Sequence, residues 1–310
     1  MKKVAISVGD LNGIGIELIL RNHDEISKHV SPIYCIDKEM LLQASSKLQL
    51  EIPQNFQTVD TVAPYFDIKP GEISKESGAY SYASFYTAVQ LAKEKKVDSI
   101  CTLPIHKKAW ELAGIDYKGH TDALRDFFKT DAIMMLGCPE LFVALFTEHI
   151  PLREVASSLT VEKLTNFLMD FTKSAKLSNT VGVLGLNPHA GDGGVLGNEE
   201  EMIAQAIKKA NNAIGKELFE GPLVPDVAFT PHIRARYTHM VAMYHDQGLA
   251  PLKALYFDKS INVSLCLPIL RTSVDHGTAF DIAYKGIELN NLSYINAIKY
   301  IVDHFISESF

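Results

Sequence analysis

The sequence predicts an α/β fold in which helices cover mainly parallel strands, and three observations lead to this prediction. Short apolar runs of strand length alternate with amphipathic segments of helical length, which is typical of layered α/β proteins. Glycine-rich or polar segments directly follow several apolar runs, and open parallel sheets bind ligands at the carboxyl ends of their strands. With 310 residues the chain is long for one core, so we expect two domains, or one domain with a large insertion.

The composition indicates an ordinary soluble globular protein, with 47% apolar and 22% charged residues. A net charge of -7 argues against a nucleic-acid-binding surface, although it leaves room for a local basic pocket. We expect neither a signal peptide nor a membrane-spanning segment, because the sequence shows no apolar run of the required length. The four scattered cysteines form no CxxC motif, so we expect buried free thiols in a cytoplasmic protein.

In the first part of the chain, apolar periodicity and turn residues define the expected elements. We expect strands at residues 3–8, 32–36 and 98–103, and helices from residue 16 and at residues 38–47 and 78–96. Between the first strand and helix, Gly9 to Gly15 form a glycine-rich turn that can expose backbone N–H groups to an anion. Its spacing is not GxGxxG, so a tight turn without a ligand is an equally good interpretation.

The second part of the chain continues the alternation of apolar runs and amphipathic segments. We expect strands at residues 132–137, 141–147, 155–159, 180–186, 241–244 and 262–267, and helices at residues 161–175, 199–214, from 249, 279–285 and 293–305. Glu199 to Glu201 open their helix at its positive end.

Three histidines stand just past apolar, strand-like runs. The runs at residues 141–147, 180–186 and 241–244 are followed by His149, His189 and His245. One histidine at a strand end is usually structural, but three neutral imidazoles around one point would bind Zn²⁺ or a similar divalent ion. Asp246, beside His245, and a metal-bound water are both candidates for a general base, and the sequence does not choose between them.

Further polar residues near the expected strand ends suit an anionic substrate. Lys253, Asn262 and Arg271 supply two cations and an amide, which suit a phosphate or a carboxylate. Each of these residues alone is more typical of a surface or capping position. They indicate a binding site only because they occur together with the histidines. His120 and Thr121 precede a helix that runs to about residue 128. Thr121 fits a helix cap, which does not exclude a ligand contact by His120.

These segments, taken together and in this order, resemble the 4-hydroxythreonine-4-phosphate dehydrogenase (PdxA) family of pyridoxal phosphate biosynthesis. The resemblance rests on GHT(D) at residues 119–122, EHIPL at 148–152, GLNPHAGDGG at 185–194, AMYHDQGL at 242–249, Lys253, and LPILRTSVDHGTAFDIA at 267–283. It implies NAD- or NADP-dependent oxidation of the secondary hydroxyl of 4-phosphohydroxy-L-threonine. The resulting 3-keto acid then loses carbon dioxide to give 3-amino-2-oxopropyl phosphate. One divalent ion (Zn, Mg or Co) is implied at each site.

The same resemblance implies roles for individual residues. The implied metal ligands are His149, His189 and His245, and the implied substrate-binding residues are His120, Thr121, Lys253, Asn262 and Arg271. The segment 276–286 resembles the loop that holds the adenosine end of NAD, with His276, Gly277, Thr278, Ala279 and Asp281 as the implied contacts.

The resemblance also implies a two-domain isocitrate/isopropylmalate dehydrogenase-like fold with mainly parallel sheets and an active-site cleft between the domains. We expect residues 1–130 and 272–310 to form the first domain, and residues 131–271 the second, which carries the metal and dimer side. A homodimer with shared active sites is implied, and we expect His245 to come from the opposite subunit to His149 and His189. No nucleic-acid or membrane partner is expected.

Other functions stay open from the sequence. Related dehydrogenases act on 4-phosphorylated threonate or erythronate. A phosphate acyltransferase binds phosphate on a similar fold but has no use for three histidine ligands. A three-histidine zinc hydrolase uses its metal to activate water and needs no NAD.

Overall fold

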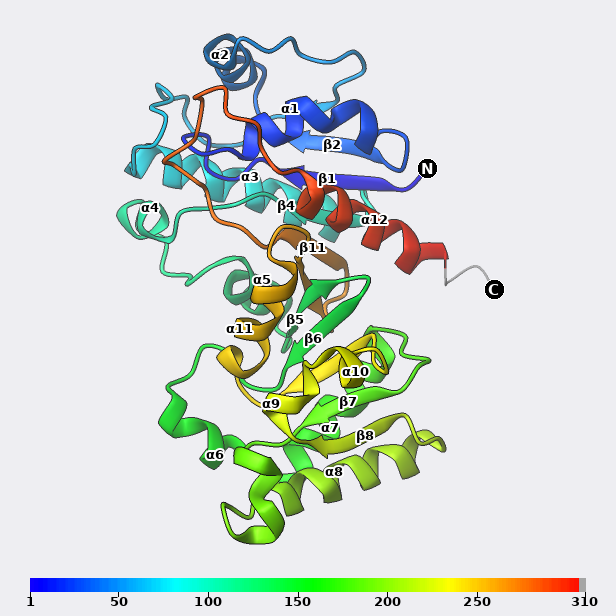
Figure 1. The fold of residues 1–310 in the computed structure, drawn as a ribbon. Helices are drawn as coiled ribbons and strands as arrows, with labels where there is room; N and C mark the ends of the chain where they lie inside the picture. Colours follow the sequence, from blue (N-terminus) through cyan, green and yellow to red (C-terminus); the bar gives the residue numbers. More distant parts are fainter. Residues whose placement is uncertain (307–310) are drawn as a thin grey trace. The chain divides into compact units, whose positions relative to one another are not determined.

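The computed structural model describes residues 1–306 and divides the chain into two compact units (Figure 1). Unit 1 contains Met1–Thr130, Ile261–Val263 and the chain from Leu267 on, and unit 2 contains Asp131–Ser260 and Ser264–Cys266. Strands and helices alternate in both units, so the predicted α/β fold class is confirmed. The expected cleft between two domains stays a prediction.

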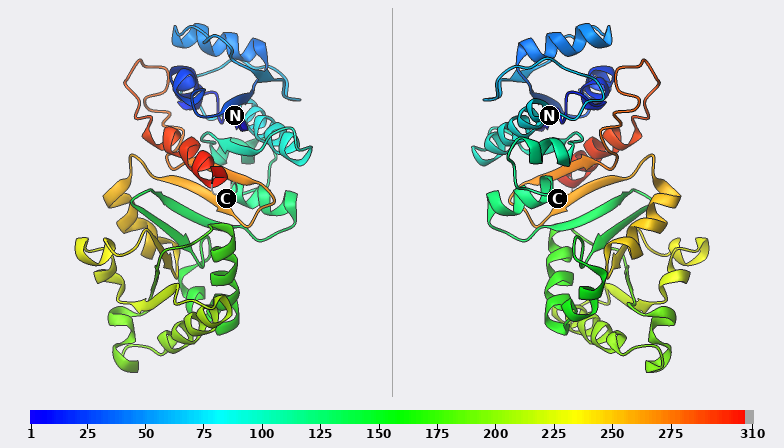
Figure 2. Two further views of the ribbon diagram at one scale, coloured as in Figure 1. Left: turned by 90° about the vertical axis from the view of Figure 1, so that its right-hand side faces the viewer. Right: turned by 90° about the vertical axis from the view of Figure 1, so that its left-hand side faces the viewer.

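Unit 1 is built on parallel strands. Their spatial order is β3 (Thr58–Val59), β2 (Ser31–Cys35), β1 (Lys3–Ser7), β4 (Ser99–Thr102) and β11 (Leu270–Val274). The helices are α1 (Gly15–Ile26), α2 (Lys38–Leu48), α3 (Lys75–Lys93), α4 (Lys107–Leu112), α5 (His120–Phe128) and α12 (Leu292–Ile306). Helices α1 and α12 cover one face of these strands and α3 covers the other (Figure 2). Strands covered on both faces need near-continuous apolar residues, and Val4, Ala5 and Ile6 of β1 are fully buried.

Unit 2 combines an antiparallel hairpin with parallel strands. Their order is β5 (Ile133–Cys138), β6 (Leu141–Leu145), β9 (His239–Ala242), β7 (Val181–Leu184) and β8 (Phe219–Leu223), and only β5 and β6 pair in antiparallel fashion. The helices are α6 (Val155–Ser158), α7 (Val161–Ser174), α8 (Glu199–Ile214), α9 (Pro225–Ala228), α10 (Pro231–Arg234) and α11 (His245–Tyr256), with 3₁₀ turns η1 (Leu152–Glu154) and η2 (Pro188–Gly194). Strand β10 (Ile261–Leu265) contributes residues to both units.

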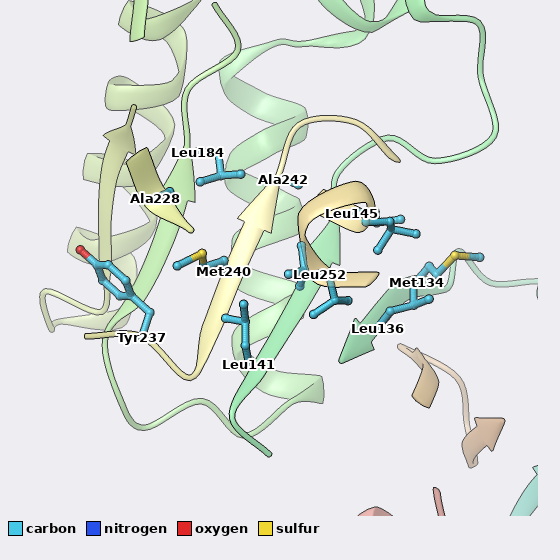
Figure 3. Packing of buried hydrophobic residues seen from close by; sticks show 12 residues of the cluster. Met134, Leu136, Leu141, Leu145, Leu184, Ala228, Tyr237, Met240, Ala242 and Leu252 are labelled. Carbon is cyan, nitrogen blue, oxygen red and sulfur yellow. The ribbon is translucent and has the colours of Figure 1, made fainter. Parts of the chain in front are cut away.

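The core of unit 2 fixes helix α11 on the strands. Figure 3 shows apolar side chains of β5, β6, β9 and α11 gathered into one cluster, with Leu252 of α11 among them. Gly248 allows the close approach, since a Cβ there would lie 2.7 Å from Val143 Cγ1 and 2.8 Å from Ala242 Cβ. The start of α11, which carries His245, is therefore held against the ends of β6 and β9.

Three expectations about local structure were wrong. Residues 155–158 form the short helix α6 and not a strand, and the hydroxyls of Ser157 and Ser158 donate to the Glu154 carbonyl. Residues 279–285 form turns and not a helix, because Ala279 and Tyr284 have φ angles of 46° and 59° in the left-handed region. Thr121 does not cap α5; Gly119 is the N-cap residue, and Thr121 lies inside the helix.

The return of the chain from unit 2 to unit 1 occurs earlier than expected. The sequence assigned residues up to Arg271 to the second domain, whereas Arg271 lies in β11 of unit 1. The reason is strand pairing, because β11 runs parallel to β4 with Arg271 opposite Ile100.

All four cysteines are free thiols, and Cys35, Cys101 and Cys138 are buried, while Cys266 is half-buried. Within residues 1–306, no helix is both long and apolar enough to cross a membrane.

Candidate functional site

Two of the three predicted metal ligands lie together at the carboxyl ends of adjacent strands in unit 2. Strands β6 and β9 are parallel, with Leu145 opposite Ala242, and His149 and His245 follow them. Their ring centres are 5.8 Å apart, and the ring planes are inclined by 40°. Two imidazoles that bind one ion through nitrogens at about 2.0–2.1 Å have ring centres roughly 5–6 Å apart. The spacing of His149 and His245 therefore fits a shared divalent ion.

A carboxylate stands beside each of these imidazoles. His245 Nδ1 lies 2.7 Å from Asp246 Oδ1, and His149 Nδ1 lies 3.0 Å from Glu148 Oε2. A proton kept on Nδ1 by a carboxylate leaves Nε2 as the coordinating atom, an arrangement typical of metal-binding histidines. The Asp246 carboxylate, a candidate general base from the sequence, is thus engaged with His245 and is placed to orient that ring.

His189 follows β7, the strand on the other side of β9, and its backbone is unusual. Residues 189–194 all have positive φ, including His189 at 52° and Ala190 at 50°. Non-glycine residues seldom adopt this left-handed conformation, and such strain is concentrated at functional sites. In the part of a single chain that the structure describes, no three or more His, Cys, Asp or Glu side chains form a metal-binding group. His189 therefore does not complete the pair of His149 and His245 within one chain.

A buried carboxylate holds the loop that carries His189. Glu200 Oε1 accepts hydrogen bonds from the backbone N–H groups of Leu186 at 2.8 Å and Asn187 at 2.7 Å. Glu200 Oε2 accepts a third bond, at 2.9 Å, from the side-chain amide of Asn187. From the sequence, Glu200 was only one of three acidic residues that open α8, because a hydrogen bond to a loop 13 residues away has no local signal.

In unit 1, Arg271 is a buried cation at strand β11. Its side chain is only 2% exposed, and its Nε and Nη2 donate to Thr102 Oγ1 at 3.2 and 2.7 Å. Burial lowers the pKa of Arg271 to about 10, so the guanidinium stays charged at neutral pH. A buried guanidinium next to strand ends is suited to bind a phosphate or carboxylate.

His120 is a neutral, buried imidazole near this cation. It packs edge-on against the rings of Phe85 and Trp110, with centres 4.8 and 5.5 Å away. Burial, and then the charge of Arg271, lower the pKa of His120 well below its usual value. Its Nε2 is buried and makes no hydrogen bond within the described structure. A buried polar atom of this kind costs stability unless a ligand satisfies it.

The other predicted substrate-binding residues fall in both units. Thr121 is buried in α5, and Asn262 of β10 has a buried Oδ1 without a hydrogen bond in the described structure. His120, Thr121, Asn262 and Arg271 belong to unit 1, whereas Lys253 of α11 belongs to unit 2. The Lys253 ammonium lies 5.9 Å from the centre of the Phe257 ring.

The expected NAD loop packs on the glycine-rich turn that follows β1. The N–H of Ile14 donates to the carbonyl of Thr278 at 3.0 Å, and the Tyr284 hydroxyl donates to the Leu11 carbonyl at 2.8 Å. A Cβ on Gly13 would lie 2.7 Å from the Thr278 carbonyl oxygen, so glycine is needed for this close contact. The loop and the turn therefore form one surface.

Two imidazoles on this surface have unsatisfied nitrogens. His276 Nδ1 lies 3.0 Å from the Gly277 carbonyl oxygen, which fixes the proton there and leaves Nε2, buried and without a hydrogen bond in the described structure, as an acceptor. Burial lowers the pKa of His276. His106, just after β4, stacks on Phe280 with ring centres 5.1 Å apart. Neutral acceptors and flat rings of this kind can bind hydroxyl, amino and base groups of a nucleotide.

Asp10 is a fully buried carboxylic acid in the glycine-rich turn, and sequence reasoning missed it. Its Oδ1 accepts from the Asn12 N–H at 3.0 Å and its Oδ2 from the Ser77 hydroxyl at 3.1 Å. Burial raises its pKa to about 6. A lone aspartate in a turn gives no sequence signal of burial, since turns are usually exposed.

The sequence model of the family described as "Pyridoxal phosphate biosynthetic protein PdxA" matches residues 28–301. The chain belongs to this family.

Individual relatives extend the similarity over nearly the whole length. A protein of Sulfurimonas denitrificans named 4-hydroxythreonine-4-phosphate dehydrogenase is 61% identical over 297 residues, which is 96% of both chains. A protein of the same name from Campylobacter fetus is 54% identical over 97% of this chain and 98% of its own. The crystal structure of a 4-hydroxythreonine-4-phosphate dehydrogenase from Klebsiella pneumoniae is 32% identical, with 97% of both chains covered and a TM-score of 0.79.

Membership of the PdxA family is consistent with the chemistry of the residues described above. The paired histidines of unit 2 offer nitrogen ligands to a metal, and the buried Arg271 of unit 1 offers a cation to an anionic group. Nitrogen ligands suit a divalent ion that polarises an oxygen, and a buried guanidinium suits a phosphate or a carboxylate.

Proposed function

We propose that the protein is a 4-hydroxythreonine-4-phosphate dehydrogenase. In this reaction the secondary hydroxyl of 4-phosphohydroxy-L-threonine is oxidised to a ketone, and the 3-keto acid loses carbon dioxide to give 3-amino-2-oxopropyl phosphate. The observation that carries the proposal is the similarity over nearly the whole chain to proteins of this name, at up to 61% identity among those described above. The histidines and the buried arginine of the candidate site supply groups that this reaction needs.

His149 and His245 would hold one divalent ion, with Zn, Mg or Co as the candidates. Their 5.8 Å ring separation supports a shared ion. When bound, the ion supplies a positive charge that polarises a substrate oxygen. Asp246 keeps the His245 proton on Nδ1 at 2.7 Å, and we assign it this orienting role in preference to that of the general base. The Glu148 carboxylate, 3.0 Å from His149 Nδ1, adds a negative charge beside that ring.

The phosphate of the substrate would bind to cations. Arg271 is buried and charged, and Lys253 is the second candidate. His120, Thr121 and Asn262 would position the amino-acid part of the substrate. The buried His120 Nε2 and Asn262 Oδ1 lack hydrogen bonds within the described structure, so a substrate that pairs with them removes a desolvation cost. Binding energy at the phosphate thereby fixes the position of the reacting carbon.

NAD or NADP would accept the hydride, and segment 276–281 would hold it. The contacts that we propose are His276, Gly277, Thr278, Ala279 and Asp281. His276 Nε2 is a buried acceptor, and Thr278 is buried against the glycine-rich turn. An acceptor at this point suits a ribose hydroxyl or an amino group of the cofactor.

We further propose a homodimer with shared active sites, in the cytoplasm. Within the described part of one chain, only two of the three histidines meet. A second subunit that contributes His189 would complete the ligand set. This arrangement differs from the expectation that His245 crosses between subunits, because His245 lies beside His149 of its own chain.

One assay tests the reaction. Purified protein is mixed with a divalent ion, NAD or NADP, and 4-phosphohydroxy-L-threonine, and the reduced nicotinamide is followed by its absorbance. The proposal is supported if the absorbance of reduced nicotinamide increases and if this increase stops when the metal is chelated. Turnover of 4-phosphorylated threonate or erythronate with higher kcat/KM would replace the substrate assignment. Hydrolysis or acyl transfer without nicotinamide reduction would contradict a dehydrogenase.

A further inference from the structure

The guanidinium of Arg271 is held by a hydroxyl from the neighbouring strand. Strands β4 and β11 are parallel, with Arg271 opposite Ile100 and Ser273 opposite Thr102. Because side chains alternate between the faces of a strand, Ile100 and Thr102 point to the same face. The Arg271 side chain thus reaches one pair further along the ladder and donates to Thr102 Oγ1 from both Nε and Nη2, at 3.2 and 2.7 Å.

Thr102 is itself fixed. It is fully buried, and its backbone carbonyl accepts a hydrogen bond of 3.0 Å from the Ser273 hydroxyl. The acceptor for the guanidinium is therefore anchored to both strands. A free arginine side chain has many rotamers, and binding one of its flat edges to a fixed oxygen reduces them before a ligand arrives.

The geometry of the bond also selects an edge of the guanidinium. Thr102 Oγ1 takes the side formed by Nε and Nη2. A guanidinium binds phosphate through two parallel N–H groups of one edge, so its plane must be oriented before the phosphate binds.

We infer that Thr102 is a positioning residue, which orients the Arg271 guanidinium for the phosphate of the substrate. The inference rests on the proposed function, in which Arg271 binds that phosphate. Thr102 acts through Arg271 and not by a substrate contact of its own.

The test compares Thr102→Val with Thr102→Ser in the full-length protein. Valine keeps the shape but removes the hydroxyl, whereas serine keeps the hydroxyl. We expect Thr102→Val to raise KM for the phosphorylated substrate about tenfold with little change in kcat, because orientation of a charge-assisted bond is lost. Affinity for inorganic phosphate, measured by calorimetry, should fall by a similar factor. Thr102→Ser should restore both values.

Thr272→Val provides a matched control. Thr272 is the next residue after Arg271 and is fully buried, and its side chain points to the opposite face of β11. Across the strands its partner is Cys101, and its hydroxyl is not part of the contact between Thr102 and the guanidinium. The control removes the same hydroxyl from a buried threonine of β11, the strand that carries Arg271, and should change neither KM nor phosphate affinity.

The variants of Arg271 and Thr102 test two separate claims: that Arg271 binds the phosphate, and that Thr102 orients Arg271. Unchanged phosphate affinity and KM in Arg271→Ala would remove Arg271 from the phosphate site, and the proposed binding mode with it. A large effect of Arg271→Ala with no effect of Thr102→Val would leave that binding mode standing and reject the positioning role. Equal losses in Thr102→Val and Thr102→Ser would also reject it. Circular dichroism checks folding, and Thr102→Ala replaces a valine variant that does not fold.

Discussion

At the scale of single residues, Arg271 is the buried cation that we propose binds the phosphate of the substrate. We expect Arg271→Ala to raise KM for the phosphorylated substrate, since each charge-assisted bond lost costs about 1.5–3 kcal/mol. Arg271→Lys should also bind poorly, because an ammonium cannot replace a planar fork held at Thr102. Steady-state kinetics measure both. Wild-type KM in either variant would contradict the assignment.

Asp10 gives a prediction about stability and pH. Its pKa is raised by burial to about 6 from 3.8, so the folded protein holds this proton at a pH at which the unfolded chain has lost it. The stability that the protonated acid contributes is complete below about pH 4 and is lost as pH rises through about 6. A shift of this size corresponds to about 3 kcal/mol.

Asp10→Asn should therefore remove this pH dependence. The asparagine can accept from the Asn12 N–H and donate to the Ser77 hydroxyl, which keeps the Ser74 carbonyl as its own acceptor at 3.3 Å. Relative to wild type, the variant should gain stability between pH 4 and pH 8, as measured by urea denaturation. Asp258→Asn, at an exposed position, serves as the control. If the free energy of unfolding changed with pH by the same amount in the wild-type protein and in Asp10→Asn, Asp10 would not be a buried titrating acid.

At the scale of elements, the position of the three histidines just past strands could be predicted from the sequence. The apolar runs gave β6, β7 and β9, and the histidines after them lie at one edge because parallel strands end together. The contacts that hold the site could not be predicted. The bond from Arg271 to Thr102 joins residues 169 positions apart, and only strand register creates it. Likewise, the left-handed backbone at His189 depends on tertiary contacts, and local propensity opposes it.

The loop at His189 is the element whose support can be tested separately. Glu200→Ala would leave the Leu186 and Asn187 N–H groups without their acceptor and should cost about 3 kcal/mol of stability. Amide hydrogen exchange at these two residues should become faster. The exposed neighbour Glu201 gives the control variant Glu201→Ala. If exchange in the loop were the same in both variants, Glu200 would not hold it.

At the scale of the whole molecule, the question is whether one chain or two chains supply the three histidine ligands of a metal site. One chain provides the neighbours His149 and His245 with ring centres 5.8 Å apart. Their strands carry the core of unit 2, so alanine variants at these histidines should stay folded and lose the metal. Metal content and circular dichroism on the same samples test this prediction, and loss of folding together with the metal would contradict it.

Differently tagged heterodimers decide which histidine crosses between subunits. If His189 crosses, a His149→Ala subunit paired with a His189→Ala subunit has one intact site and one site with both lesions, so about half of wild-type activity per dimer should return. In that arrangement, His149→Ala paired with His245→Ala leaves one lesion in each site and restores nothing. If His245 crosses instead, the two results are exchanged. No recovery in either heterodimer would mean that each subunit supplies all three ligands itself. We expect the first result, because His149 and His245 already lie together in one chain.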